Sequence, residues 1–250
     1  MSDNLNERRI IELAERCYNT NQYTFTDFLS LAEQSDYYRM ERELSYVKAT
    51  LFGGCDLSER RLIRFGSEDQ LGYDQPFPIS AIMVRPLIEK FSDDLGHRDF
   101  LGAIMNLGIE RSVVGDIFID GNTAYVFCLD SIAPYICENL SKIKHTSVRC
   151  ELLEAVPDHL SSGSGTEKLI QVASMRIDAV VSRVYNLSRS DSLELFRKCL
   201  VFVDGRLTES NSGSVSAGQA ITVRGYGKFK ILEEGGLSRK GKINIRVLEY

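Results

Sequence analysis

The sequence predicts a mixed α+β fold in three modules, and two observations lead to this prediction. Apolar residues recur at intervals of three and four in some segments and alternate in others, and the two kinds of segment are interleaved along the 250 residues. Domains usually have about 100–200 residues, so a chain of this length is long enough for two or three small domains. Changes of pattern place the modules at 1–75, 76–156 and 168–250, and the small polar residues of 157–167 predict a flexible linker.

The first module is predicted to be a small unit of helices and strands. Its apolar residues lie on one side of a helix expected over Leu5–Tyr18. Thr26 is the expected cap of a second helical stretch that runs through Leu31 and into Tyr37–Glu43, because a threonine hydroxyl accepts hydrogen bonds from the free amides of a first turn. Strands are expected at Val47–Phe52 and Arg61–Phe65.

The middle module is predicted to run strand–helix–strand–strand–helix–strand. The strand patterns cover Ile79–Arg85, Val113–Asp120, Thr123–Leu129 and Thr146–Leu153, and the helical patterns cover His97–Leu107 and Ser131–Ile143. This order is the split ferredoxin-like arrangement and also that of the RRM. Right-handed crossovers place both helices on one face of the sheet.

Two aromatic residues, Tyr125 and Phe127, share one face of their strand. In an RRM the corresponding strand carries aromatic side chains that stack on bases. The segment AYVFC lacks the basic-Gly-aromatic start of that consensus, so we expect both rings to pack inside the protein. Arg98, Arg111 and Lys144 are the basic residues of this module that could assist RNA binding.

The C-terminal module is organised around residues 175–205, which predict two short helices, a polar corner and a strand. Ser188 is placed to cap the second helix, and Asp204-Gly205 is a hairpin signal after a strand at Leu200–Val203. The buried stripes of the two helices are expected to be Ile177, Val180, Val181 and Val184, and Leu193, Leu195 and Phe196. Further strands are expected at Leu169–Ala173, Ala220–Arg224, Phe229–Leu232 and Lys242–Leu248.

This module resembles the S-four RNA-binding domain, which is named after small-subunit ribosomal protein four. The resemblance rests on the segments MRID, LSRS, FRKCLVFVDGR and AGQAITVRGYGKF. The chain departs from the family at Cys199 and Gln219, where the family often has Gly and Asp. The resemblance implies RNA binding, for which we single out seven residues: Arg176, Ser188, Arg189, Arg197, Lys198, Arg206 and Tyr226.

Each of these residues also has a purely structural interpretation. A guanidinium donates two parallel hydrogen bonds to a phosphate, but Arg176 could instead pair with Asp178. Arg189 could be a solvated arginine, although a cation at a helix start opposes the helix dipole and therefore needs another reason to be there. Tyr226 could stack on a base or fill a turn. Arg197, Lys198 and Arg206 either widen a basic patch or are solvated.

The charge distribution favours the C-terminal module as the part that binds RNA. The whole chain carries a net charge of −5. Residues 167–250 hold 14 Lys and Arg against 9 Asp and Glu, whereas residues 1–166 hold 16 against 26. A basic module on an acidic body fits local phosphate binding better than uniform coating of nucleic acid.

Over about 75–250 the chain closely resembles the bacterial YlmH family. The resemblance is carried by HRDFLGAIMNLGIERSVVGDIFID, AYVFC and ICENLSKIKHTSVRCE, and more loosely before residue 75 by FTDFL and FGG. It implies an RRM-like middle domain, a C-terminal S-four domain and ribosome association. It also implies a role in quality control of stalled nascent chains, in which the S-four domain contacts rRNA and tRNA on the large subunit. The expected protein is cytoplasmic, and monomeric off the ribosome.

Other classes of function lack support in the sequence. No apolar run approaches the roughly 20 residues of a membrane span, and the charged start predicts no secretory signal. The six cysteines form no C-x-x-C pair and the three histidines show no metal spacing, so we expect no metal and no cofactor. His97-Arg98-Asp99 imitates a kinase catalytic loop, but Ile104 stands where that loop needs Asn. The sequence therefore predicts a non-enzymatic RNA-binding factor, with an rRNA-modifying enzyme or a cell-division adaptor as alternatives.

Overall fold

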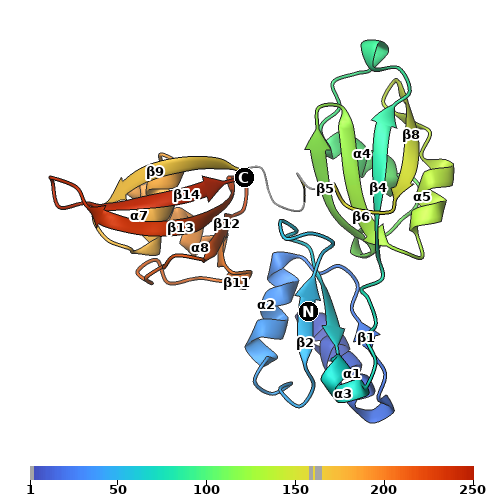
Figure 1. The fold of residues 1–250 in the computed structure, drawn as a ribbon, viewed down its shortest axis with the longest axis horizontal. Coiled ribbons are helices and arrows are strands. Elements are labelled where there is room, and N and C mark those ends of the chain that lie inside the picture. The colour runs from blue at the N-terminus through green and yellow to red at the C-terminus, as the bar shows by residue number, and fades with distance from the viewer. Residues whose placement is uncertain (1–2, 158–159, 161–164) are drawn as a thin grey trace. The chain divides into compact units, whose positions relative to one another are not determined.

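The computed structural model describes residues 3–157, 160 and 165–250, and the chain divides into two compact units (Figure 1). The units are Met1–Ser162 and Gly163–Tyr250. The division falls inside the predicted linker 157–167, much of which, including His159, lies outside the described residues. Each unit combines helices with an antiparallel sheet, which confirms the α+β class.

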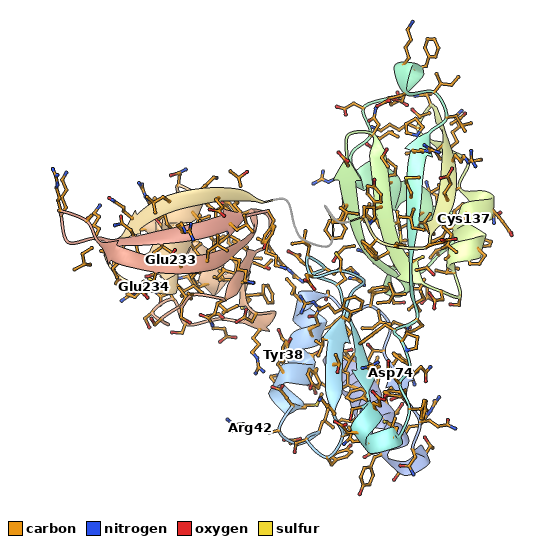
Figure 2. The ribbon with its side chains drawn as sticks, viewed as in Figure 1. Tyr38, Arg42, Asp74, Cys137, Glu233 and Glu234 are labelled. Atoms are coloured by element: carbon orange, nitrogen blue, oxygen red, sulfur yellow. The ribbon has the colours of Figure 1, made fainter. Side chains whose placement is uncertain are left out.

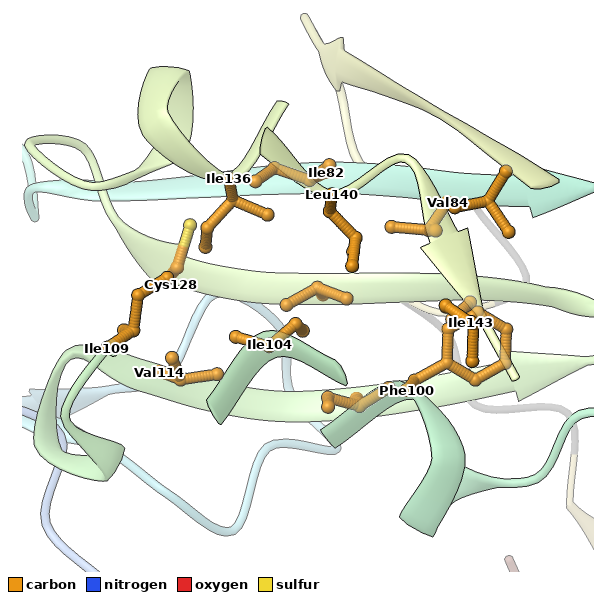
Figure 3. Close-up of a cluster of buried hydrophobic side chains, with 14 of the residues drawn as sticks. Ile82, Val84, Phe100, Ile104, Ile109, Val114, Cys128, Ile136, Leu140 and Ile143 are labelled. Atoms are coloured by element: carbon orange, nitrogen blue, oxygen red, sulfur yellow. The ribbon is translucent and has the colours of Figure 1, made fainter. Parts of the chain in front are cut away.

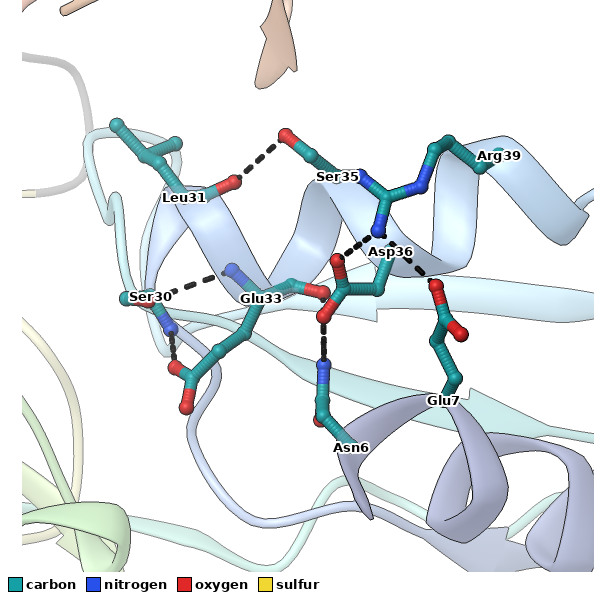
Figure 4. Close-up of polar contacts among 8 residues, drawn as sticks. All are labelled: Asn6, Glu7, Ser30, Leu31, Glu33, Ser35, Asp36 and Arg39. Atoms are coloured by element: carbon teal, nitrogen blue, oxygen red, sulfur yellow. Dashed lines mark hydrogen bonds and ion pairs between the residues drawn. The ribbon is translucent and has the colours of Figure 1, made fainter. Parts of the chain in front are cut away.

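The first unit opens with three helices and a three-stranded antiparallel sheet of order β1-β3-β2. The helices are α1 (Asp3–Thr20), α2 (Leu31–Met40) and the short α3 (Glu68–Leu71), and the strands are β1 (Thr24–Phe25), β2 (Ala49–Phe52) and β3 (Leu62–Phe65). The buried carboxylate of Asp36 on α2 ties the two long helices together. It accepts from Asn6 Nδ2 at 2.6 Å and from Arg39 Nη2 at 2.5 Å, and Arg39 also reaches Glu7 at 3.0 Å (Figure 4).

The predicted cap at Thr26 is wrong, because Ser30 caps α2. Ser30 and Glu33 form a reciprocal capping box, in which each side chain accepts from the other's backbone amide (Figure 4). Thr26 instead continues alongside β3. Its amide donates to the Ile63 carbonyl at 3.0 Å and its hydroxyl accepts from the Ile63 amide at 2.8 Å. The amide and hydroxyl of Thr26 are therefore used in pairing with Ile63 and are not available to cap a helix.

The middle of the first unit has the predicted order of strands and helices. Its antiparallel sheet has the order β5-β6-β4-β8-β7, and both helices cover one face, where they enclose a core that includes Phe100, Ile104 and Ile136 (Figure 3). The strands are β4 (Ile79–Pro86), β5 (Val114–Asp120), β6 (Thr123–Leu129), β7 (Lys142–Ile143) and β8 (Thr146–Leu153), and the helices are α4 (His97–Met105) and α5 (Ala133–Asn139), with single 3-10 turns at Glu89–Phe91 and Arg111–Val113.

The helix expected over Ser131–Ile143 is shorter than predicted. It ends at Asn139, and Ile143 pairs with Thr146 in a tight hairpin whose turn holds Lys144 at a φ of 51°. Tyr135 on this helix is 43% exposed and donates its hydroxyl to the Leu107 carbonyl. Pairing with β8 therefore overrides the helical periodicity of the last residues.

The N-terminal elements cover the other face of the middle sheet around Phe127. Phe127 is 1% exposed and packs with Phe28 and Leu62 from the N-terminal part. Two glycines allow this close approach. A Cβ on Gly54 would lie 2.2 Å from a carbon of the Phe127 ring, and one on Gly115 would lie 2.7 Å from the Phe28 ring. The packing expected for Phe127 is confirmed, and it joins the first two predicted modules into one unit.

A polar joint closes the same interface. The Asp116 carboxylate of β5 accepts from the backbone amides of Glu59 at 2.5 Å and Arg60 at 2.9 Å. The Arg60 guanidinium donates to three backbone carbonyls, those of Phe28, Arg111 and Val114. Arg111 in turn donates to the carbonyls of Val114 and Gly115. Burial, with the nearby charge of Arg60, lowers the pKa of Arg111 to about 10.

The second unit is a six-stranded antiparallel sheet of order β11-β10-β12-β13-β14-β9 with two helices on one face (Figure 1). Its strands are β9 (Thr166–Val172), β10 (Val201–Val203), β11 (Arg206–Leu207), β12 (Ala220–Val223), β13 (Gly227–Leu237) and β14 (Ile243–Glu249), and its helices are α7 (Ile177–Val184) and α8 (Arg189–Arg197). The predicted hairpin at Asp204-Gly205 is confirmed, since both residues have positive φ angles, 50° and 81°, as a type I′ turn requires. β9 begins three residues before the expected Leu169.

Candidate nucleic-acid interface

Arg176 occupies the N-cap position of α7, just ahead of the helix as predicted. Its guanidinium donates to the Asp178 carboxylate through Nε at 3.1 Å and Nη2 at 2.8 Å. This pair uses two of the five N–H donors of an arginine. Since the Arg176 side chain is 44% exposed, the remaining donors are accessible to a further acceptor. The salt bridge and a phosphate contact are therefore compatible at this residue.

Asp178 is a structural residue that positions Arg176 rather than a helix cap. It lies in the first turn of α7, is 7% exposed, and accepts from the Ala179 amide at 2.9 Å. The hydrogen bonds from Arg176 lower the pKa of this carboxyl group against the opposing effect of burial. Its backbone carbonyl accepts from the Ser192 hydroxyl at 3.0 Å, which joins α7 to α8.

Ser188 caps α8, as predicted. Its hydroxyl oxygen accepts from the Asp191 amide at 3.1 Å, and Asn186 takes the turn between the helices with a φ of 53°. Arg189 is the first residue of α8 and is exposed. Within the described part of the chain, its side chain forms no hydrogen bond or ion pair. A cation thus stands at a helix start without a protein anion to hold it.

The two helices form a surface hollow of about 600 Å³ whose cationic lining is Arg176, Arg183 and Arg189. Asp178 is the acidic residue in the lining, so the net charge is +2, and Gln171, Ser182 and Asn186 add polar groups. The hollow therefore presents several hydrogen-bond donors from one rigid helix pair. Such an arrangement suits an oxyanion with several oxygens, and phosphate is the common one.

Arg183 is absent from the residues selected from the sequence. It is exposed in the last turn of α7 and lies seven residues after Arg176, so two helical turns bring both onto the same side. The motif drew attention to the residues at the helix starts. The helical spacing of the arginines is the signal that would have identified Arg183.

The other basic residues selected from the sequence lie outside the lining of this hollow. Arg197 pairs with Glu194 at 2.5 Å in the last turn of α8, and Lys198 is the C-cap of that helix. With a rise of about 1.5 Å per residue, they lie roughly 12 Å along the axis from Arg189. Arg206 is exposed on the edge strand β11. The structure thus brings together Arg176 and Arg189 and places the remaining three elsewhere on the second unit.

Tyr226 lies in the turn between β12 and β13, flanked by Gly225 and Gly227 at φ angles of 85° and 125°. Its ring centroid is 5.5 Å from that of Tyr185, at an interplanar angle of 50°, and its side chain remains 48% exposed. One part of the ring therefore packs on the protein while another part is accessible.

The middle domain offers no exposed aromatic pair on β6. Tyr125 is 9% and Phe127 is 1% exposed, so neither ring is accessible to a base. Arg111 is occupied with backbone carbonyls. Accessible cations lie instead beside a hollow of about 410 Å³ between α4 and β7, which Arg98, Lys142 and Lys144 line. Lys144 pairs there with Asp99 at 2.7 Å.

The described residues hold neither a candidate metal site nor a helix that could span a membrane. Among them there is no group of three or more His, Cys, Asp or Glu side chains that could hold a metal ion. None of the described helices is both long enough and apolar enough to span a membrane.

Comparison with known proteins shows which proteins the chain is similar to. Residues 75–156 match the family model described as "Putative RNA-binding domain in YlmH". The chain is 26% identical over 217 residues to Ribosome-associated protein quality control protein P2 of Bacillus subtilis (strain 168), an alignment that covers 87% of this chain and 83% of that protein. The middle of the chain is therefore similar to the RNA-binding domain of YlmH. The YlmH match ends at residue 156, so the arginine hollow lies beyond the domain that the family model describes.

A solved structure is also similar to this chain. It is the Cell division protein ylmH from Streptococcus pneumoniae, with 21% sequence identity and a TM-score of 0.48. The alignment covers 61% of this chain and 92% of that one.

Proposed function

We propose that this protein is a non-enzymatic RNA-binding factor of the cytoplasm that associates with the ribosome. Its RNA partners would be rRNA and tRNA on the large subunit, and its task would be quality control of stalled nascent chains. The convergence of Arg176, Arg183 and Arg189 in one hollow is the observation that carries the proposal. The name of the Bacillus subtilis relative supports the ribosomal setting.

The hollow would recognise the RNA backbone by shape and charge. The helix pair is held by Asp178 and Ser192, so the three guanidinium groups are presented on a fixed frame. A fixed frame loses less side-chain entropy on binding than cations on mobile loops. Ser188 lies at the same helix start, but its hydroxyl donates to the Asp191 carboxylate at 2.6 Å, so its role there is to cap and fix the helix rather than to donate to a phosphate. Phosphate contacts position a protein on structured RNA without reading its sequence.

The middle domain would contribute from its edge rather than from its sheet face. The N-terminal elements bury the Phe127 position on which an RRM would stack a base. The cations Arg98, Lys142 and Lys144 beside α4 are accessible. An RNA contact by this domain would therefore be electrostatic and not a base-stacking contact.

The test is ribosome co-sedimentation of an Arg176→Ala/Arg189→Ala double variant and of an Arg183→Ala single variant. The double variant should be lost from the ribosomal fraction while it remains folded, because two phosphate contacts disappear. The slope of log affinity against log salt should fall by about 0.7–0.9 for each lost contact, so by roughly 1.5 for the double variant. Arg183→Ala should weaken binding by about one contact.

An Arg8→Ala/Arg16→Ala variant is the matched control. Both residues are exposed on α1 of the acidic first unit, so the charge change is the same and the hollow is intact. Unchanged sedimentation of the Arg176→Ala/Arg189→Ala variant would refute the site. Equal loss in the control would show that binding depends on net charge alone.

A further inference from the structure

The hairpin that joins β13 to β14 extends past the rest of the second unit (Figure 1). The adjacent edge strand β9 ends at Val172, which pairs with Ile243 at the start of β14. Residues 238–242 therefore lie beyond the last residue of β9. The turn is closed by two backbone bonds, from the Ser238 amide to the Lys242 carbonyl at 2.7 Å and from the Gly241 amide to the Ser238 carbonyl at 2.9 Å. The tip is thus a defined turn on a long two-stranded stem.

The tip carries three exposed cations and no acidic residue. Arg239, Lys240 and Lys242 are exposed, and within the described part of the chain none of their side chains forms an ion pair. The hairpin's acidic residues, Glu233 and Glu234, lie back on β13 in the body of the sheet, and Glu233 pairs with Arg246 at 2.9 Å (Figure 2). Mutual repulsion of three neighbouring cations is unfavourable without an anion to offset it, so a bound anionic partner would stabilise the tip.

The tip lies at the same end of the unit as the arginine hollow. Val172 lines the hollow and is also the residue that pairs with Ile243, immediately after Lys242. Residues 238–242 form the turn directly beyond this pair, so the tip begins one residue beyond the end of β9. The tip and the hollow therefore both adjoin the end of β9 at Val172.

We propose that the tip of the β13–β14 hairpin, residues 237–242, is a second RNA-contacting element that binds the phosphate backbone of the RNA held in the hollow. The inference rests on the proposed function, which names RNA as the partner of the hollow. Its cations would add phosphate contacts that the helix pair cannot reach. Leu237, 72% exposed at the start of the turn, would lie against the apolar side of a ribose or base.

The test uses the full-length chain with Arg239→Gln/Lys240→Gln/Lys242→Gln, together with deproteinised rRNA and intact ribosomes as probes. The log–log salt slope for rRNA should fall by about 2–3, and affinity near physiological salt should fall roughly 10- to 100-fold. The matched control is Arg8→Gln/Arg9→Gln/Arg16→Gln, which removes the same charge from exposed positions on α1. Both variants should unfold at the wild-type urea concentration, since all six side chains are exposed.

The outcomes separate this inference from the proposed function. If the hairpin variant keeps the wild-type affinity and slope while Arg176→Ala/Arg189→Ala loses binding, the hairpin is not an RNA contact and the proposed function stands. If the hairpin variant binds free rRNA normally but loses ribosomes, the tip contacts a ribosomal protein and the RNA assignment is overturned. If the wild-type chain binds neither probe, the proposed function fails as well.

Discussion

Replacement of Phe127 by alanine distinguishes the two roles that an aromatic residue on β6 of this fold could have. The ring is 1% exposed and packs against Phe28 and Leu62, and its edge meets Phe118 at a centroid distance of 5.8 Å and an angle of 90°. Removal of a fully buried phenylalanine costs about 3–5 kcal/mol of unfolding free energy. If the ring instead stacked on a base, its loss would cost about 1–3 kcal/mol of binding and little stability.

The assay is urea denaturation of the full-length Phe127→Ala variant, followed by circular dichroism, with rRNA affinity measured in parallel. With an m-value of roughly 2 kcal/mol per M for the first unit, the midpoint of its transition should fall by about 1.5–2.5 M. Affinity of the folded variant for rRNA should remain near the wild-type value, because the ring lies inside the protein. Leu152→Ala on β8 of the same sheet is the control, since that side chain is 57% exposed and its loss should move the midpoint little.

Two results would refute this reasoning about Phe127. An unchanged midpoint would show that the N-terminal elements do not pack on this face in solution. A folded variant with rRNA affinity reduced tenfold or more would show that the ring reaches RNA after all.

Two further predictions concern the second unit. Cys199 follows α8 at a φ of 54°, a left-handed conformation that glycine adopts without strain. Cys199→Gly should therefore raise the free energy of unfolding of this unit by up to about 1 kcal/mol, measured by urea denaturation. A loss of stability would contradict this reasoning. Asp178 has a lowered pKa in the folded state, so the stability it contributes is present above its unfolded pKa of about 3.9 and is lost as pH falls through the lower folded pKa. Asp178→Asn should therefore be less stable than wild type at neutral pH, and the difference should shrink below about pH 4, whereas a constant difference would exclude the carboxylate as its source.

Much of the fold follows from local patterns. The helix–corner–helix of the second unit, the cap at Ser188 and the turn at Asp204-Gly205 are where the sequence places them. The strand–helix–strand–strand–helix–strand order of the middle domain is likewise present. These features depend on side chains and φ angles within a few residues of one another, so they can be predicted from the local sequence.

The failures lie where strand pairing or backbone carbonyls use groups that a local pattern assigns to another role. Thr26 has the chemistry of a cap, but pairing with Ile63 uses its backbone and hydroxyl. The last residues of the helix expected to end at Ile143 pair with β8 instead. Arg111 is basic in the sequence, yet its donors are used by carbonyls at the interface with the N-terminal elements. Ile63 lies 37 residues from Thr26, so spacing cannot reveal that pair. The partners of Ile143 and Arg111 lie only three or four residues away, but in turns that helical periodicity does not indicate.

The candidate site is divided in the same way. The sequence by itself determined that Arg176 and Arg189 stand at the starts of two adjacent helices, because capping and helical periodicity are local. Only the tertiary structure decided that Arg183 shares their hollow, that Arg197 does not, and that the N-terminal elements bury Phe127. Those outcomes depend on how helices and sheets pack across the chain, since packing selects which of several basic or aromatic side chains remain exposed.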